Sequence, residues 1–349
     1  AMLDAYSAGG NGFLRATDRL PVEYHLLETA PEPWEPWDSL AVFKVRHVAM
    51  GVWETKLWRG RLLRAVGPET VARLYRGTQP GERVMLPPGG TYSGRAGDAL
   101  AELQTALEAL GWLSEDEGGS NSWVVAGERT ASGRPLLAGD PHRAPDVPGA
   151  YLPNHLACEA FDVTGLSFAG VPGFPHFGHN ERVAWCITHT GGDAQDLFVE
   201  RFDPQNPARY LHKGEWREAE QHEEIIAVRG ADPVAVTVTI THHGPVVAGD
   251  PASGAAIALQ YTATDGENRT GDCLLEMLTV RSGAELDEAM RHWVDPINNR
   301  LYADVEGQTG YRTRGRLPVR PRENGWAPVA EGAQGEPIWE IAATYLRDK

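Results

Sequence analysis

The residues GGSNSWVVAGERTASGRPLLAGDPH (118–142) mark the point at which the character of the sequence changes. An acidic segment without apolar periodicity, WLSEDEGGSN (112–121), leads into them and predicts an exposed loop. Two short runs typical of strands follow, from Ser122 to Val125 and from Pro135 to Leu137. Helical patterns fill the sequence before this point, and strand patterns fill most of the sequence after it.

The sequence before residue 112 predicts helices. Residues 54–67 and 96–110 both place leucines at helical spacing, and Gly111 is a suitable helix stop. Between these helices, residues 87–94 (PPGGTYSG) are rich in turn formers. The first residues, 1–14, resemble the middle of a helical segment and carry no initiator methionine, so we expect the sequence to be a piece of a longer chain.

The sequence after the boundary predicts strands joined by turns. Residues 234–240 (VAVTVTI) alternate with threonine at every second position, and residues 256–261 (AIALQY) form a second candidate strand. A helix is expected over residues 285–293. A hairpin of RLYAD and TGYRTR, joined across residues 305–308, follows it. Helices first and strands afterwards predict an α+β fold rather than a parallel βαβ protein.

Composition and charge narrow the classes of function. The formal net charge of −16 argues against a nucleic-acid partner, because an acidic surface repels phosphates. No apolar run approaches the roughly 18–20 residues that span a bilayer. The three cysteines (Cys158, Cys186 and Cys273) are too few for a disulfide framework or a zinc site, and we interpret them as buried small apolar residues.

Common catalytic signatures are absent from the sequence. It contains no P-loop, no well-placed G-x-G-x-x-G, no G-x-S-x-G and no H-E-x-x-H. Two histidine pairs, His176 with His179 and His242 with His243, are candidate metal ligands. Neither pair has a carboxylate at ligand spacing, so packing or hydrogen bonding in strand-end turns is the favoured interpretation.

Ser120 stands at the boundary itself, in GGSN. By itself this is a flexible turn, but residues 120–142 closely resemble the start of the β chain in the penicillin acylase family of N-terminal nucleophile hydrolases. The resemblance continues through residues 151–202, 241–247 and 298–318, while residues 5–14, 20–27 and 31–40 resemble the end of the family's α chain. It implies an α-chain part over 1–111, mostly helical, a spacer over 112–119, and a β-chain part over 120–349.

The resemblance also implies a fold and a mechanism. The fold would be a four-layer αββα sandwich with antiparallel sheets. Ser120 would be freed as a new amino terminus by self-cleavage after Gly119, and its own α-amine, with a pKa of about 8, would then act as general base. Gly119 suits that step, since glycine tolerates a strained backbone and leaves space for attack. His142 would orient the amine, and the backbone N–H of His189 would stabilise the oxyanion.

One part of the family's site is not matched in this sequence. The second oxyanion donor of the family is an asparagine side chain further toward the C-terminus, and Asn298 and Asn299 lie too early in the pattern for that role. We interpret both as structural, and the chain as a fragment with an incomplete sandwich. Trp123 and Phe177 are equally suited to an acyl pocket and to the core.

The resemblance further implies a structural calcium ion. Asp193 and Asp196 would supply carboxylates and Gln195 a backbone carbonyl, all hard oxygen ligands, with Glu54 of the α chain as a further ligand. The ion would join the two chains rather than activate water. The alternative interpretation is an acidic turn before a strand.

The expected function is hydrolysis of a linear amide with release of an acyl group. Candidate substrates are β-lactam side-chain amides, acyl-homoserine lactones, and acylated lipopeptides or polyamines. The expected partners are this small-molecule substrate and the protein's own α and β chains, in a periplasmic or secreted location. Two alternatives are a non-catalytic relative that keeps the fold for binding, and a calcium-dependent adhesion protein, which would need repeated acidic loops where we find one.

Overall fold

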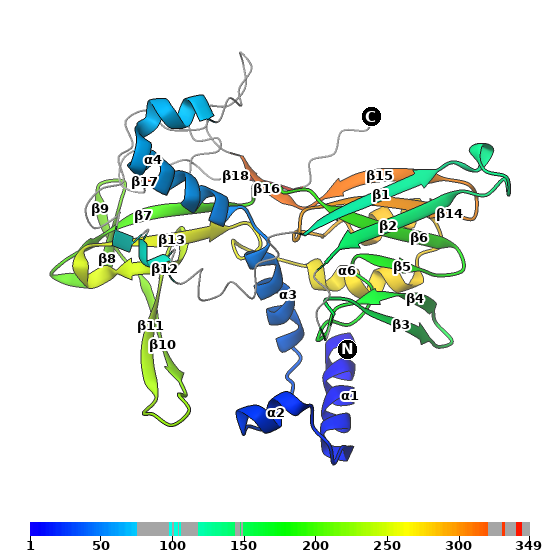
Figure 1. Cartoon of the computed structure of the whole chain (residues 1–349), viewed down its shortest axis with the longest axis horizontal. Coiled ribbons are helices and arrows are strands. Elements are labelled where there is room, and N and C mark those ends of the chain that lie inside the picture. Colours follow the sequence, from blue (N-terminus) through cyan, green and yellow to red (C-terminus); the bar gives the residue numbers. More distant parts are fainter. Residues whose placement is uncertain are drawn as a thin grey trace. The chain divides into compact units, whose positions relative to one another are not determined.

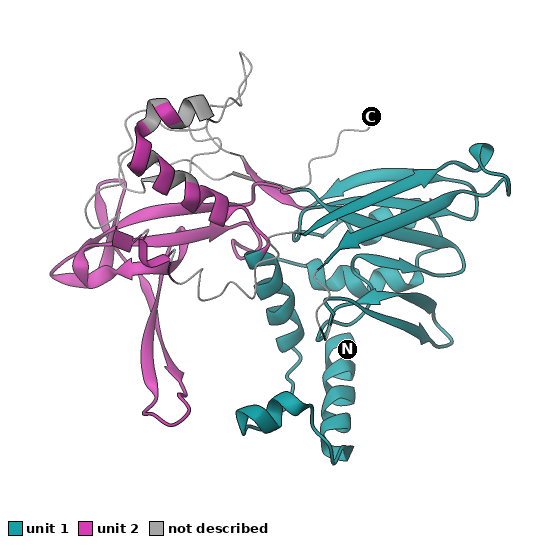
Figure 2. Cartoon of the chain, viewed as in Figure 1, with its two compact units in different colours: residues 1–49, 115–190, 268–314 teal, residues 50–114, 191–267, 315–349 magenta. Residues whose placement is uncertain are grey.

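The chain folds into two compact units, each built from three separate segments (Figure 2). The computed structural model describes residues 1–74, 98–99, 101–103, 105, 118–143, 147, 149–319, 330–331 and 340–343. Unit 1 comprises residues 1–49, 115–190 and 268–314, and unit 2 comprises residues 50–114, 191–267 and 315–349. Each unit therefore takes segments from both sides of the Gly119–Ser120 bond.

Unit 1 holds a six-stranded antiparallel sheet and a separate two-stranded ribbon (Figure 1). The strand order in the sheet is β15-β14-β6-β5-β4-β3, and the ribbon pairs β1 with β2. These strands are β1 (Gly119–Val125), β2 (Leu136–His142), β3 (Leu152–Ala157), β4 (Asp162–Ser167), β5 (Phe177–His179), β6 (Val183–His189), β14 (Asn298–Asp304) and β15 (Thr309–Arg314). The helices of the unit are α1 (Met2–Ala16), α2 (Val22–Leu27), α3 (Asp38–Ala49), α6 (Thr270–Glu276) and α7 (Gly283–Ala289).

The ribbon packs on one face of the six-stranded sheet. Val124 and Leu137 from the ribbon meet an apolar cluster that includes Phe177 and Cys186 from the sheet. Gly139 permits this close approach, because a Cβ there would lie 2.6 Å from the Cβ of Cys186. The sheet and the ribbon thus form two stacked β layers, with the strand that carries Ser120 in the outer one.

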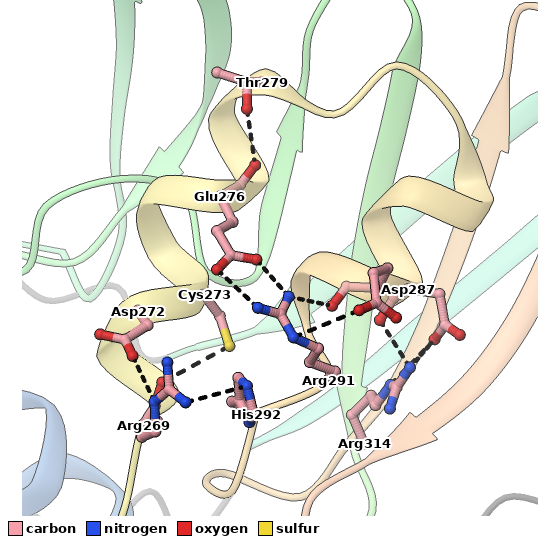
Figure 3. A network of polar contacts seen from close by, with 10 residues as sticks. Arg269, Asp272, Cys273, Glu276, Thr279, Asp287, Arg291, His292 and Arg314 are labelled. Atoms are coloured by element: carbon pink, nitrogen blue, oxygen red, sulfur yellow. Dashed lines mark hydrogen bonds and ion pairs between the residues drawn. The ribbon is translucent and has the colours of Figure 1, made fainter.

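Helices cover the other face of this sheet. The main core of unit 1 joins sheet residues such as Val163 and Trp185 to Leu274 of α6, Leu286 of α7 and Phe43 of α3. Polar contacts fasten the helices to each other and to β15 (Figure 3). Arg291 donates to both carboxylate oxygens of Glu276, at 2.7 and 3.3 Å. These contacts complete a helix–sheet–ribbon stack within unit 1.

Unit 2 is built on a second antiparallel sheet, with the order β10-β11-β12-β13-β7-β8-β9. Its strands are β7 (Gln195–Asp203), β8 (Asn206–His212), β9 (Glu215–Glu218), β10 (Glu220–Ile226), β11 (Val234–Thr241), β12 (Gly244–Asp250) and β13 (Ala255–Tyr261). The short β17 (Ala330–Glu331) adds to β7 in parallel, and β16 (Arg316–Val319) pairs with β18 (Glu340–Ala343). Helix α4 (Trp53–Leu74), interrupted at Gly67, contacts β7.

Most of the predicted elements are confirmed, with three corrections. The expected loop over residues 112–121 ends earlier, since Gly119, Ser120 and Asn121 already pair with β2; residues 112–117 lie outside the described residues. The helix expected over residues 285–293 is α7, Gly283–Ala289, which begins earlier because Ser282 caps it through the N–H of Glu285. Cys158 is exposed rather than buried, whereas Cys186 and Cys273 are buried.

Two predictions fall largely on residues that the structure leaves undescribed. The helix expected over 96–110 is seen as helix at residues 98–99, 101–103 and 105 alone, and the turn-rich segment 87–94 lies outside the described residues. By contrast, the hairpin predicted around residues 305–308 is confirmed as β14 and β15. Among the described residues, no helix combines the length and the apolar character needed to cross a membrane.

Candidate active site

Ser120 lies in β1, on the side of the ribbon that faces the six-stranded sheet. Exposure alternates along the strand, with Ser120, Ser122 and Val124 partly buried and the residues between them exposed. The Oγ of Ser122 donates to the backbone carbonyl of Ile187 at 3.1 Å, and Val124 packs into the apolar cluster between the two layers. Since side chains two residues apart share a face of a strand, Ser120 faces the same way.

Gly119 lies directly opposite His142 in the antiparallel register of β1 and β2. A Cβ at Gly119 would lie 3.1 Å from Nδ1 of His142, closer than most side chains allow. The φ angle of Gly119 is not in the left-handed region, unlike that of many described glycines. Glycine is favoured at this position because the imidazole lies against it.

His142 is exposed and has two polar neighbours that the sequence did not point to. Its Nε2 lies 3.1 Å from Oδ2 of Asp140 and 3.3 Å from Nδ2 of Asn121. The register pairs Asn121 with Asp140 and Gly119 with His142, so all four residues meet at the end of the ribbon. This arrangement fixes the imidazole with Nε2 toward the amide and carboxylate, and with Nδ1 toward Gly119.

His189 ends strand β6, where it pairs with Asn298 of β14. The hydrogen bond from Ser122 to the Ile187 carbonyl anchors the ribbon to this end of β6. Ser120 lies two residues before Ser122, and His189 lies two residues after Ile187, so both are close in sequence to this hydrogen bond. The residues implied as nucleophile, orienting histidine and oxyanion donor thus belong to one unit and to neighbouring strands of its two β layers.

Asn298 and Asn299 make contacts of the structural kind that the sequence predicts. The Nδ2 of Asn298 lies 3.3 Å from Nε2 of the buried His176, whose Nδ1 lies 3.0 Å from the Tyr151 hydroxyl. Asn299 donates to Thr188 Oγ1 at 3.0 Å and accepts from the Tyr311 hydroxyl at 2.6 Å. His176 is thus a hydrogen-bonded core histidine, and His179 contacts the carbonyl of Asn180.

Two buried histidines make unit 1 sensitive to acid. Burial, reinforced by nearby cationic groups, holds the pKa values of His47 and His176 well below the usual value of about 6.5. Below pH 6.5 the unfolded chain therefore binds more protons than the folded chain. The contribution of these histidines to the free energy of unfolding is complete above pH 6.5 and decreases as the pH drops below it. We expect the free energy of unfolding to fall by up to about 1.4 kcal/mol per pH unit for each histidine.

Urea unfolding at pH 7.5, 6.5 and 5.5 measures this dependence. His47→Leu should reduce the slope below pH 6.5 by the contribution of one proton. His155→Ala, which removes a solvent-exposed histidine paired with Asp162, should leave most of the slope in place. Equal slopes for His47→Leu and the parent would contradict a neutral His47.

The donors predicted to bind calcium do meet in unit 2, but they meet around a lysine. The Nζ of Lys56 on α4 lies 2.6 Å from Oδ1 of Asp193 and 2.5 Å from the backbone carbonyl of Gln195. It also contacts Oδ1 of Asp196. Lys56 is 1% exposed, and both carboxylates are buried. One ammonium thus sits among the three oxygen donors.

Helix α4 is held against this segment by a second contact. The backbone N–H of Trp53 donates to Oε1 of Gln195 at 3.3 Å, and a Cβ at Gly51 would lie 1.6 Å from that same oxygen. Glu54, the fourth predicted ligand, does not gather with Asp193 and Asp196 into any metal-sized group among the described residues. As they stand, these residues do not fit a calcium ion, because Lys56 already supplies the positive charge.

The two aromatic residues that sequence reasoning left open differ in their surroundings. Phe177 is 7% exposed and belongs to the cluster between the ribbon and the sheet. Trp123 is 52% exposed on the outer face of the ribbon, away from that cluster. Phe177 is therefore a core residue, and Trp123 is not.

Comparison with known proteins places these features in a family. A family model described as penicillin amidase matches residues 1–346. Penicillin acylase 2 proenzyme of Pseudomonas sp. strain SE83 is 44% identical over 348 residues, which cover 97% of this chain and 44% of that protein. Acyl-homoserine lactone acylase QuiP of Pseudomonas syringae pv. tomato is 27% identical, over 97% of this chain and 42% of that protein.

A solved structure agrees with this assignment. Thermostable penicillin G acylase from Alcaligenes faecalis matches with a TM-score of 0.56 and 28% identity, over 64% of this chain and 40% of that one. The chain spans less than half the length of these relatives. The match confirms the predicted fold class of helices and antiparallel sheets as that of N-terminal nucleophile hydrolases. The chain belongs to the penicillin amidase family.

Proposed function

We propose that the protein containing this chain is an amidohydrolase that cleaves linear amides through an acyl-enzyme on Ser120. The observation that carries the proposal is the pairing of Gly119–Ser120 with Pro141–His142 at the end of the ribbon, in a chain of this family. In this register the His142 imidazole lies against Gly119, next to the bond to be cut, while the Ser120 side chain points to the other face of the ribbon. The relative at 27% identity is an acyl-homoserine lactone acylase, which also supports amide hydrolysis.

The proposed reaction begins with self-cleavage. The Oγ of Ser120 attacks the carbonyl of Gly119, the peptide bond breaks to give an ester, and water hydrolyses that ester. The α-amine so freed has a pKa of about 8, and its neutral form accepts the hydroxyl proton when Ser120 attacks a substrate amide. The amine of the substrate leaves with a proton, and water then releases the acyl group. The N–H of His189 donates to the oxyanion in both tetrahedral intermediates.

The relatives suggest which amides to test first. The relative at 44% identity is a penicillin acylase, so the side-chain amide of a β-lactam is the first candidate. The relative at 27% identity is an acyl-homoserine lactone acylase, which makes that amide the second. In both candidate substrates a linear amide links an acyl group to an amine, and this is the class of bond that the mechanism cleaves.

Trapping the intermediate tests the proposal directly. The purified parent protein is incubated with each amide and quenched in acid. The mass of the peptide that begins at Ser120 is then measured by mass spectrometry. We expect acyl release together with a mass increase equal to the acyl group on that peptide. A protein that is cut after Gly119, yet hydrolyses none of the amides and carries no acyl group, would support the non-catalytic binding alternative instead.

His142 is expected to act as a positioning residue. Because its ring lies against Gly119 and is held by Asp140 and Asn121, His142→Ala should let the new amino terminus adopt several orientations. We expect kcat to fall on the order of 10- to 100-fold with a smaller change in KM. The pH profile of kcat/KM should shift as well, since the amine loses a charged or polar neighbour.

His155→Ala is the matched control for this experiment, since His155 is also exposed and paired with an aspartate, Asp162, in the same unit. It should leave kcat and the pH profile as in the parent. If His142→Ala lowered only the yield of folded protein, and the folded fraction kept full kcat, His142 would have a purely structural role.

We further propose that the two chains produced by cleavage remain associated. Phe43, from before the cut, lies in the main core of unit 1, and Lys56 lies among buried acidic groups of unit 2. The two products should therefore elute together in gel filtration under native conditions. A periplasmic or secreted location is proposed from the penicillin acylase relatives, and fractionation of the source cells and their medium tests it.

A further inference from the structure

Three histidines and one glutamate converge in unit 2. Glu200 lies on β7, His212 ends β8, and His242 and His243 form the two-residue turn between β11 and β12. Ligand atoms of Glu200, His242 and His243 lie within 4.8 Å of one another. The ring of His212 meets that of His242 edge-on, with 3.9 Å between centroids. The sequence singled out this histidine pair but offered no carboxylate; the fold supplies one from 42 residues earlier.

Glu200 is the member of the group whose surroundings need an explanation. Its side chain is fully buried, and its Oε1 accepts hydrogen bonds from Thr241 Oγ1 and from His243 Nδ1, both at 2.7 Å. Its Oε2 is buried and has no hydrogen-bond partner among the described residues. A buried carboxylate oxygen without a partner is costly, and such groups are usually found paired or bound to a cation.

The turn is shaped so that its imidazoles face this carboxylate. Gly244 has φ of +120°, and a Cβ there would lie 2.3 Å from the carbonyl of Leu259, so only glycine closes the turn at this point. The ring of His243 stacks flat on Phe198, with 3.7 Å between centroids and 9° between planes. Phe198 and Glu200 share a face of β7, because they lie two residues apart. The stacking therefore holds His243 over the same face as the carboxylate.

His242 contributes an accessible imidazole to the group. It lies on the exposed side of the group, so an ion can reach it from solvent. Imidazole nitrogens are among the commonest ligands of divalent metal ions in proteins.

We propose that Glu200, His242 and His243 form a binding site for a divalent transition metal ion of the zinc class. Two imidazoles and one carboxylate are the donors that zinc takes in proteins, with bonds of about 2.0–2.2 Å. The ion takes the place of the proton between Nδ1 of His243 and Glu200, and that proton is released to solvent. The ion also neutralises the buried carboxylate and clamps the β11–β12 turn to β7, a structural role within unit 2.

Metal titration of the intact protein tests this site. The parent protein is freed of metal with a chelator, returned to buffer at pH 7.5 and titrated with Zn²⁺ by calorimetry, then with Co²⁺ by visible absorption. We expect one equivalent to bind, with the intense visible bands of tetrahedral Co²⁺. His242→Ala should weaken this binding on the order of 100-fold or more, since a direct ligand matters more than the outer-shell groups that cost 10- to 100-fold.

The controls separate loss of a ligand from loss of the fold. His242 is exposed, so His242→Ala should fold, and circular dichroism checks this. His222→Ala removes another exposed histidine of the same unit, paired with Glu220, and should bind Zn²⁺ as the parent does. Glu200→Gln keeps the size and an acceptor for Thr241 and should also lose binding. A parent that binds no zinc, or equal binding by His242→Ala and His222→Ala, would overturn the proposal.

Discussion

Replacing Ser120 by alanine is expected to leave the parent protein uncut at the Gly119–Ser120 bond. Alanine has no hydroxyl to attack the Gly119 carbonyl, so the ester that leads to cleavage does not form. Amide hydrolysis should be lost with it, because both the nucleophile and the free amine are missing. Mass spectrometry of the purified full-length protein measures the cut, and the parent should yield a chain that begins at Ser120.

The matched control is Ser122→Ala. Ser122 lies on the same face of β1 and donates to the Ile187 carbonyl, so its loss removes one hydrogen bond and about 1 kcal/mol of stability. Cleavage after Gly119 should still take place in this variant. Cleavage of the Ser120→Ala protein at the same bond would point to a separate protease, and a correctly folded parent that stays in one piece would refute the self-cleavage mechanism.

The strands of both units are the part of the fold that the sequence predicted best. Residues 256–261 form a short, largely apolar run, and residues 305–308 include the turn former Gly307; these local patterns appear as β13 and as the β14–β15 hairpin. Such rules act over a few residues and need no knowledge of distant contacts. The beginning of β1 was missed for the opposite reason. Gly119 and Ser120 look like a loop locally and become strand only by pairing with His142 and Pro141.

In the candidate site, too, some residues could be predicted from the sequence and others could not. Ser120, His142 and His189 were found through resemblance to a family, whereas Asn121 and Asp140 around His142 were not. Their contacts depend on the register of two strands, which neither residue reveals by its type. Glu200 was missed as the partner of His242 and His243 because it comes from another strand. Sequence reasoning names the reactive residue types, but contacts between distant segments decide what each of them faces.

The division of the chain into α and β parts is a prediction about processing, and it differs from the division into compact units. Residues 1–49 share unit 1 with residues 115–190, and residues 50–114 share unit 2 with residues 191–267. Cutting one bond between them leaves both cores intact. If the protein is cut after Gly119 as proposed, this interleaving keeps the two parts together. The buried contacts between them, including that of Lys56, then contribute to stability.

Lys56→Met is expected to destabilise the protein by about 3–5 kcal/mol, because it removes a buried ammonium that contacts two buried carboxylates. Methionine keeps the length of the side chain, so the loss reflects uncompensated charge more than a cavity. Arg61→Met, which removes a positive charge from an exposed position on the same helix, should change stability by less than about 0.5 kcal/mol. Urea unfolding of the three proteins, first freed of metal, measures the difference.

Calcium added to these metal-free proteins then distinguishes an internal ammonium from a missing ion. In Lys56→Met the oxygens of Asp193, Gln195 and Asp196 lose the Lys56 ammonium, so millimolar Ca²⁺ should restore part of the stability. In the parent, the Lys56 ammonium already occupies the centre of this donor set, and Ca²⁺ should leave the unfolding midpoint unchanged. A parent stabilised by Ca²⁺ as strongly as the variant would instead restore the calcium site that the sequence predicted, with Lys56 displaced from these oxygens when the ion binds.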